Sequence, residues 1–269
     1  MKKFAYICSS MLVLLLAFTL PTNAFAKETV KESMVRIIHA SPDAPAVDIY
    51  VDGKLVAEKA AFKDVTDYLK LPAGKYKVEV FASGTKDEQD PVIQADLTTE
   101  AGQAYTAAAV NTVDKIELVV TKDDLTLPKG TTKIRVGHFS PNAPEVTVKL
   151  KDGKPVFENV AFKDVTSFTQ LSPGIYDFVV NTAVGNQQVL DLSGTKLEAD
   201  TIYSVYAVNT ADKIEPLIVT YSLDMQTIAM NGGADALPER PSSTPYIAAS
   251  ALIAGLVLFV GMNKALRNR

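Results

Sequence analysis

Cysteine and tryptophan are almost missing from this chain of 269 residues, which holds one cysteine and no tryptophan. The cysteine, Cys8, lies in an apolar N-terminal run that we expect to be removed, so the mature chain would carry no thiol. Disulfide bonds, cysteine-bound zinc and thiol catalysis are therefore excluded, and the fold must be stabilised by hydrophobic cores. Histidine is also scarce, because the chain has only His39 and His138.

Basic residues are too few and too scattered for a nucleic-acid protein. The chain has 27 Lys and Arg against 31 Asp and Glu, and five of the basic residues lie at its two ends. The segment between the ends is therefore acidic. Because nucleic acids and anionic lipids need a cationic footprint, we exclude both as partners of that segment.

The N-terminus has the pattern of an export signal. Lys2 and Lys3 precede an apolar run that ends near Leu20, and Ala24-Phe25-Ala26 supplies a small-x-small cleavage site. We predict a signal peptide over residues 1–26.

The C-terminus has the pattern of a membrane anchor. Residues 246–262 carry no charge, and three basic residues follow by position 269. Seventeen residues at about 1.5 Å each span ~25 Å, and a few more reach across a bilayer core. We predict a transmembrane helix over residues 246–266 with a basic cytoplasmic tail to 269, after a flexible stalk over 225–245. A buried core helix is the alternative.

The segment before this span resembles a Gram-positive wall-sorting signal. Leu237 and Pro238 match the L-P-x-T-G motif of sortase substrates, but Arg240 and Pro241 replace its Thr and Gly. The residue that would form the acyl-enzyme is missing. We therefore favour a single-pass cell-membrane location with an extracellular ectodomain over wall attachment.

The middle of the chain is a duplication. The sequence AFKDVT occurs at residues 61–66 and 161–166, and a VNT-x-DKIE segment follows each copy. We predict two domains, over residues 35–124 and 133–224, joined by a short connector as a semi-rigid tandem.

Each copy alternates apolar and polar residues with period two, as in strands that bury one face. Val47, Ile49 and Val51 are expected to point inward, and Asp-Gly pairs predict hairpin turns. The fold class we predict is all-β, with two tandem immunoglobulin-like antiparallel β-sandwich domains. Pro216 is expected in an edge strand, because proline cannot donate to a neighbouring strand.

Two tyrosines resemble the corner residue of immunoglobulin-like and fibronectin-like sandwiches. Tyr76 and Tyr176 each follow a Leu-x-x-Gly turn and open a predicted strand. In such a corner the tyrosine hydroxyl bonds back to the turn.

Both copies also resemble a named bacterial family. His-x-Ser-Pro-x-Ala-Pro-x-Val begins at His39 and at His138, and the DGK, AFKDVT and Leu-x-x-Gly-x-Tyr segments follow in order. This order is similar to domain of unknown function 4397, a repeat of exported and surface proteins. The resemblance implies location and fold, but the family name carries no activity.

The matched histidines are predicted to be structural. Each domain offers one histidine, too few for zinc, and the nearby Asp43 of the first copy is Asn142 in the second. A histidine at a strand end can instead bond backbone groups of the following Pro-rich turn. The predicted structural turn motif consists of His39, Ser41, Pro42 and Pro45 with His138, Ser140, Pro141 and Pro144.

Two other sets of residues suggest ligand binding. Asp43, Asp48 and Asp52 carry calcium-type oxygens, but their spacing matches no EF-hand, so we prefer a solvated acidic face and leave calcium open. Tyr50, Tyr68 and Tyr105 offer a carbohydrate platform, although tyrosines on sheets are more often packing residues. Lys63 and Lys163 are expected to be exposed charges.

We predict no catalytic residue, cofactor or metal, and hence no enzyme. The expected function is binding, adhesion or envelope organisation by a membrane-anchored extracellular protein. Its partner would be an extracellular protein, a glycan or a wall polymer. Its C-terminal helix would anchor it in the membrane. The alternatives are a hydrolase of surface polymers that uses His39, Ser41 and Asp43, and a purely structural spacer.

Overall fold

The computed structural model describes residues 32–222. The predicted signal peptide, stalk, transmembrane helix and sorting motif lie outside these residues. Between residues 32 and 222, no helix is long and apolar enough to cross a membrane.

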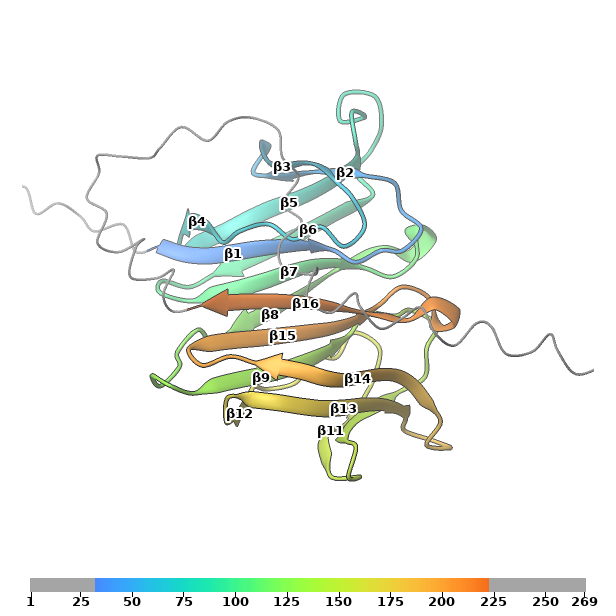
Figure 1. Cartoon of the computed structure of the whole chain (residues 1–269). Helices are drawn as coiled ribbons and strands as arrows, with labels where there is room; N and C mark the ends of the chain where they lie inside the picture. The colour runs from blue at the N-terminus through green and yellow to red at the C-terminus, as the bar shows by residue number, and fades with distance from the viewer. Residues whose placement is uncertain (1–31, 223–269) are drawn as a thin grey trace, which may run out of the picture. The chain divides into compact units, whose positions relative to one another are not determined.

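The regular secondary structure of the described chain is almost entirely β-strand (Figure 1). The first half contains β1 (Glu32–His39), β2 (Val47–Val51), β3 (Lys54–Ala60), β4 (Leu69–Pro72), β5 (Gly74–Ala82), β6 (Ile93–Thr99), β7 (Ala104–Val110), the 3-10 helix η1 (Val113–Lys115) and β8 (Glu117–Asp123). The second half contains β9 (Thr132–His138), β10 (Val146–Leu150), β11 (Pro155–Val160), β12 (Thr169–Leu171), β13 (Gly174–Thr182), β14 (Gln188–Leu197), β15 (Thr201–Val208), η2 (Ala211–Lys213) and β16 (Glu215–Ser222).

Each half forms two four-stranded sheets. The orders are β4-β1-β7-β8 and β3-β2-β5-β6 in the first domain, and β12-β9-β15-β16 and β11-β10-β13-β14 in the second. The matching orders confirm two tandem copies of one all-β domain. Pro216 lies in β16, at the edge of its sheet, as predicted.

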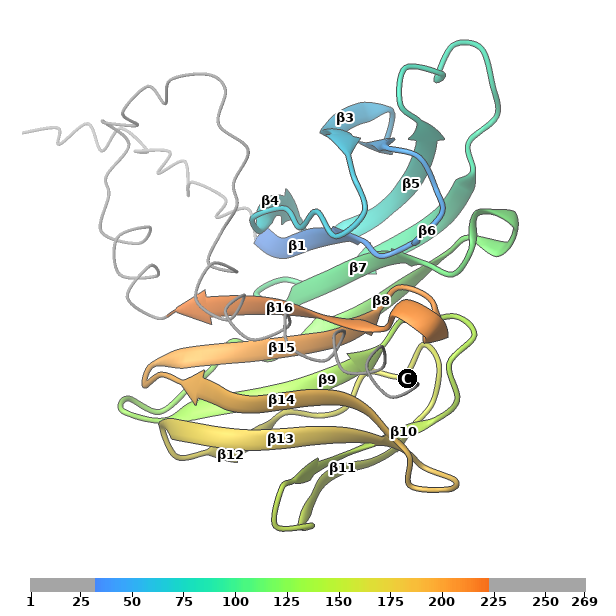
Figure 2. The ribbon, with the colours of Figure 1, turned by 45° about the vertical axis from the view of Figure 1, so that its right-hand side comes forward.

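The expectation of purely antiparallel sheets is wrong for one strand pair in each domain. β1 pairs in parallel with β7, and β9 pairs in parallel with β15. β9, β15 and β16 run side by side (Figure 2). Apolar alternation predicts which face of a strand is buried but not its direction. β7 arrives from β6 in the other sheet, and this crossing lets it enter beside β1 in the same direction.

The two sheets of each domain pack over one hydrophobic core. In the first domain Val35 and Ile37 of β1 join Val47 and Ile49 of β2, and none is more than 6% exposed. The second core leaves a cavity of about 40 Å³ between its sheets, lined by apolar side chains. This cavity is small beside the roughly 300–1,000 Å³ of a typical small-molecule pocket.

The predicted turn chemistry is present. Asp52 and Gly53 have φ of 48° and 75°, the left-handed pair of a tight hairpin between β2 and β3. Tyr76 Oη donates to the Pro72 carbonyl, and Tyr176 Oη donates to the Ser172 carbonyl at 2.8 Å. These are the hydrogen bonds that a tyrosine corner requires.

Candidate functional site

His39 ends β1 as a fully bonded side chain. It is 1% exposed, its Nε2 lies 3.1 Å from the Pro45 carbonyl oxygen, and its Nδ1 accepts the Ser41 N–H at 3.3 Å. Because Nδ1 is the acceptor, Nε2 carries the proton and donates to the carbonyl. Both ring nitrogens are therefore occupied by the turn that follows the strand.

His138 repeats this arrangement at the end of β9. It is fully buried, its Nε2 lies 3.0 Å from the Pro144 carbonyl oxygen, and its Nδ1 accepts the Ser140 N–H at 3.3 Å. The hydroxyl groups of Ser41 and Ser140 are sealed from solvent and make no hydrogen bond in the described residues. The pair of atoms that a serine nucleophile and its base would need is therefore not in contact.

The repeated AFKDVT segment explains how the histidine backbone is held. The His39 N–H donates to the Asp64 carbonyl at 3.0 Å, and the Lys63 N–H donates to the His39 carbonyl at 2.7 Å. His138 makes the same two bonds with residues 163 and 164. AFKDVT thus extends the edge of β1 and of β9 beyond β4 and β12.

Acid is expected to destabilise the fold through these histidines. Burial is the main cause that lowers the pKa of His39 and His138 below the usual 6.5. The unfolded chain therefore binds protons more readily, and stability present above about pH 6.5 is lost as the pH falls below that value. We expect the urea midpoint to fall between about pH 7.5 and about pH 5. In a chain with His39→Gln and His138→Gln, the urea midpoint should fall less steeply with pH. An unchanged slope would show that the histidines do not cause the fall.

Asp43 and Asn142 have one shared structural role. Asp43 Oδ1 accepts the Val113 N–H at 2.8 Å, and Asn142 Oδ1 accepts the Ala211 N–H at 2.9 Å. Each side chain ties the turn after the histidine to the short 3-10 helix of its own domain. Only a neutral or charged acceptor oxygen is needed, which explains why aspartate and asparagine replace one another.

Replacing Asp43 with asparagine is expected to change the free energy of unfolding by no more than about 0.5 kcal/mol. Asp43→Ala should cost about 1 kcal/mol, because the Val113 N–H loses its acceptor. Urea unfolding of both variants measures the difference. Equal losses for the two variants would show that the negative charge of Asp43, and not only its acceptor oxygen, stabilises the turn.

Asp48 does not lie on a solvated acidic face. It is 6% exposed, and its carboxylate accepts the Lys59 N–H at 2.7 Å, the Gly84 N–H at 2.8 Å and the Ser83 hydroxyl at 3.0 Å. Burial raises the pKa of Asp48, but these hydrogen bonds outweigh it and lower the pKa below its usual value. The residue fixes a bulge in β3 and the turn after β5.

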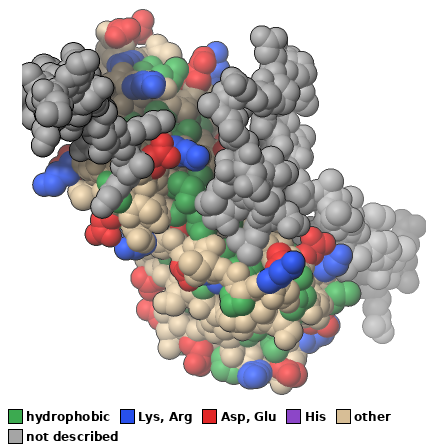
Figure 3. Space-filling view, turned by 90° about the vertical axis from the view of Figure 1, so that its left-hand side faces the viewer, with side chains coloured by type: hydrophobic (Ala, Val, Ile, Leu, Met, Phe, Trp, Pro, Cys, Tyr) green, Lys and Arg blue, Asp and Glu red, His purple; other side chains and the backbone are tan. Residues whose placement is uncertain are grey.

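The three tyrosines weighed as a sugar platform do not share a surface. Tyr105 lies in the first core at 7% exposure. Tyr68 packs against Tyr221 of the second domain, and the Tyr50 ring is covered by Lys86 Nζ at 3.8 Å from its centroid. On the visible part of the face in Figure 3, acidic and basic side chains are interspersed.

The feature that the sequence did not predict is a buried interface between the two domains. An apolar cluster joins Ile38, Ala40, Ala108 and Val110 of the first domain to Phe139, Tyr206, Val208 and Val219 of the second. The first domain contributes small or aliphatic side chains, and the second contributes two stacked aromatic rings, 4.8 Å apart. The domains therefore form one packed unit through unlike surfaces.

Two ion pairs flank this interface in reciprocal fashion. Lys63 of the first domain pairs with Glu215 of the second at 2.9 Å, and Lys163 of the second pairs with Glu117 of the first at 3.2 Å. The lysine of each repeat thus pairs with the equivalent glutamate of the other repeat, as in a twofold-symmetric dimer. Both lysines are exposed, as expected, and each also makes one of these inter-domain ion pairs.

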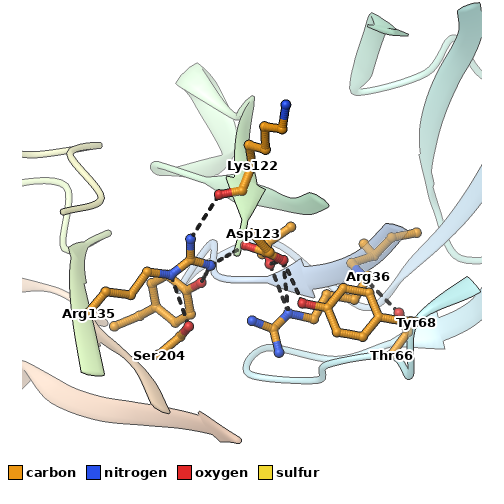
Figure 4. Close-up of polar contacts among 10 residues, drawn as sticks. Arg36, Thr66, Tyr68, Lys122, Asp123, Arg135 and Ser204 are labelled. Atoms are coloured by element: carbon orange, nitrogen blue, oxygen red, sulfur yellow. Dashed lines mark hydrogen bonds and ion pairs between the residues drawn. The ribbon is translucent and has the colours of Figure 1, made fainter. Parts of the chain in front are cut away.

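A buried ionic cluster lies between the domains, formed by Arg36, Asp123 and Arg135 (Figure 4). Their side chains are at most 5% exposed. Arg135 Nη2 bonds Asp123 Oδ1, and Arg36 Nε lies 3.9 Å from Asp123 Oδ2. The single carboxylate therefore serves one guanidinium from each domain.

Hydroxyl groups complete the coordination of Asp123. Tyr68 Oη and Thr106 Oγ1 both donate to Asp123 Oδ2 at 2.6 Å. Burial is the main cause that raises the pKa of Tyr68, so its phenol remains a hydrogen-bond donor. This arrangement can position and hold the two domains, but it contains no group that is free to act as a base.

A family model matches most of this architecture. The model, described as Domain of unknown function (DUF4397), matches residues 33–149 and 150–229, which together exceed half of the chain. The chain belongs to the DUF4397 family. The division between the two matched segments falls within β10, so it differs from the boundary of the structural domains. No curated protein matches the chain.

Three solved structures are similar to this chain only at low sequence identity and low TM-score. The C-terminal domain of AlgF from P. aeruginosa is 20% identical, with 35% of this chain and 100% of that chain covered and a TM-score of 0.29. A leucine-rich repeat protein from Bacteroides thetaiotaomicron is 17% identical, with 67% and 26% covered and a TM-score of 0.19. CBMbc (family CBM26) from Eubacterium rectale Amy13K, in complex with maltoheptaose, is 13% identical, with 71% and 96% covered and a TM-score of 0.23. All three TM-scores are below 0.5, so no function is transferred.

Candidate metal ligands do not cluster in the two DUF4397 domains over residues 32–222. This part of the chain contains no group of three or more His, Cys, Asp or Glu side chains that could hold an ion.

The sequence did carry a signal for the buried ionic cluster, because Arg36 and Arg135 each stand three residues before a repeated histidine. An arginine at an inward-facing strand position needs a buried acceptor, but the acceptor's identity is not readable from that position.

Proposed function

We propose that this DUF4397 protein is a non-enzymatic cell-surface protein whose two domains act as one binding unit. In this proposal the C-terminal helix holds the protein in the cell membrane with an extracellular ectodomain. The partner is an extracellular protein, a glycan or a wall polymer. Each domain is of immunoglobulin-like type, with its tyrosine corner and a parallel strand added beside β1 or β9.

One observation carries the proposal. The polar side chains that recur in both domains are used within the fold, as His39 and His138 illustrate, while the inter-domain surface is built to hold the domains together. A duplicated enzyme would be expected to repeat a reactive set, but the hydroxyl groups of Ser41 and Ser140 are sealed and make no hydrogen bond within residues 32–222. A fixed pair of domains suits display and noncovalent recognition instead.

Among residues 32–222, the most exposed large apolar side chain on a strand lies in the second domain. Ile175, at the start of β13, is 73% exposed and borders a shallow hollow lined also by Pro173, Lys196 and Glu198. The first domain has Lys75 at the same place in its Leu-x-x-Gly-x-Tyr turn. Because the other copy has a lysine at this place, the hollow can be tested for partner contact with a matched substitution.

Binding can be tested with a matched substitution. The purified chain would be screened against glycan, wall-polymer and extracellular-protein panels, and each hit would be remeasured with Ile175→Lys. This change installs the residue of the first repeat, so we expect the fold to be retained and affinity to fall at least tenfold. Lys75→Ala in the first domain is the control. Binding unchanged by Ile175→Lys would reject this surface, and no hit on any panel would leave only the spacer function.

A further inference from the structure

Arg36 and Arg135 occupy equivalent positions in the two repeats but have very different partners. Arg135 donates from Nε to Ser204 Oγ, from Nη1 to the Lys122 carbonyl, and from Nη2 to both Asp123 and Tyr206. Arg36 donates from Nε to Thr106 Oγ1 at 2.8 Å, and neither Nη1 nor Nη2 bonds any residue in the range 32–222. Figure 4 shows both terminal nitrogens of Arg36 without a contact.

Two substitutions between the repeats account for this difference. Counted from the VNT-x-DKIE segments, Ala108 of the first domain corresponds to Tyr206 of the second, and Tyr221 of the second corresponds to Asp123 of the first. The reciprocal interface therefore places a carboxylate beside Arg135 and a tyrosine in the equivalent position for Arg36. Tyr221 packs edge-on against Tyr68 at 5.7 Å, and Tyr68 in turn lies against the Arg36 guanidinium at 4.9 Å.

Within residues 32–222, the cluster therefore carries more positive than negative charge. Two guanidinium groups with side chains at most 5% exposed share one carboxylate, and the nearby Lys133 is already paired with Asp124 at 2.7 Å. A buried guanidinium with two unbonded nitrogens is costly unless an acceptor reaches it.

The terminal nitrogens of Arg36 differ from the sealed polar atoms of this part of the chain. Between residues 32 and 222, only Ser41 Oγ, Ser140 Oγ and Asn181 Oδ1 are sealed from solvent without a partner. Arg36 Nη1 and Nη2 are not among these atoms, although the residue is 4% exposed. A fork of two N–H donors matches the two oxygens of a small oxyanion.

We propose that the Nη1 and Nη2 edge of Arg36 is an anion-binding site that takes a small oxyanion, in the place that the Asp123 carboxylate occupies beside Arg135. The bound anion neutralises the cluster and stabilises the packed pair of domains. The site therefore links the rigidity of the tandem to an anion in its surroundings, independently of any partner that binds the outer surface.

The test measures the melting temperature of the purified full chain by circular dichroism at constant ionic strength, while sodium chloride is replaced by sodium phosphate, sulfate or acetate. Wild type is expected to show a saturating rise of about 4–8 °C with at least one of these anions. Arg36→Met should lose the rise. Tyr221→Asp, which supplies the carboxylate that the first repeat has, should also lose the rise, whereas Tyr221→Asn should keep it.

Three outcomes would overturn the proposal. One is an absent or non-saturating response in wild type, and another is an equal response in wild type, Arg36→Met and Tyr221→Asp. The third concerns Asp224, the next acidic residue after β16 along the chain. A rise seen only in Asp224→Asn would show that a carboxylate of the chain itself fills the site. The response, and not the starting stability, is compared, so a moderately destabilised variant remains informative.

Discussion

Replacing Asp123 with alanine is expected to lower the free energy of unfolding by about 3–5 kcal/mol, because two buried guanidinium groups lose their shared carboxylate. Tyr68 and Thr106 lose their common acceptor at the same time. Since the chain has no tryptophan, urea unfolding is best followed by circular dichroism. We expect the single transition of wild type to separate into two, as the domains lose their mutual support.

The matched control for this prediction is Asp96→Ala. Asp96 is exposed on β6 of the same domain, and its replacement removes the same charge without touching the interface. Its effect should remain within about 0.5 kcal/mol. If Asp123→Ala costs less than about 1 kcal/mol, its carboxylate behaves like one partner of a surface pair, and the two domains are not packed together in solution.

Adding one methyl group at Gly137 should also disrupt the interface. A Cβ at this position would stand 2.5 Å from Tyr206 Cδ1, 2.9 Å from its Cε1 and 3.2 Å from Val165 Cγ2. The Tyr206 ring stacks on Phe139 and its hydroxyl bonds Arg135, so it cannot move without losing both contacts. We expect Gly137→Ala to cost about 1–3 kcal/mol, measured by urea unfolding.

The first domain provides the rescue for this substitution. There Ile38 pairs with Ala108 in the register in which Gly137 pairs with Tyr206, so the large and small residues are exchanged. The combination Gly137→Ile with Tyr206→Ala should cost less than the sum of its single changes, by about 0.5–3 kcal/mol. Gly174→Ala is the control, because a Cβ there meets nothing nearer than 3.8 Å. Additive costs would contradict a direct steric conflict.

The repeated segments were predictable in place and partly in role. Alternation placed Val47, Ile49 and Val51 in the core, the Asp52-Gly53 pair predicted a hairpin, and Pro216 predicted an edge strand. These features depend on near neighbours along the chain. The direction of β7 was not predictable in this way, because parallel pairing with β1 brings together residues about seventy positions apart.

The candidate sites also differ in whether their contacts are local or come from distant parts of the chain. The turn after His39 bonds its ring within six residues, so its geometry is local and its structural role remains a prediction for the histidine variants to test. Asp48 was misjudged as solvated, because its partners Lys59 and Gly84 come from β3 and from the turn after β5. The excess positive charge at Arg36 appears only when Tyr221 of the other repeat is brought against Tyr68, whose ring lies beside Arg36.

The sequence by itself determined that this protein is a duplicated all-β chain, because strand period, turn residues and repeats are properties of contiguous segments. Only the tertiary structure decided that the two copies are packed through unlike faces around one shared carboxylate. Each repeat has the same inward arginine, and nothing within one repeat specifies which residue of the other will meet it. That partner is set by the packing of Ala108 and Ile38 against Phe139 and Tyr206, which depends on both domains at once.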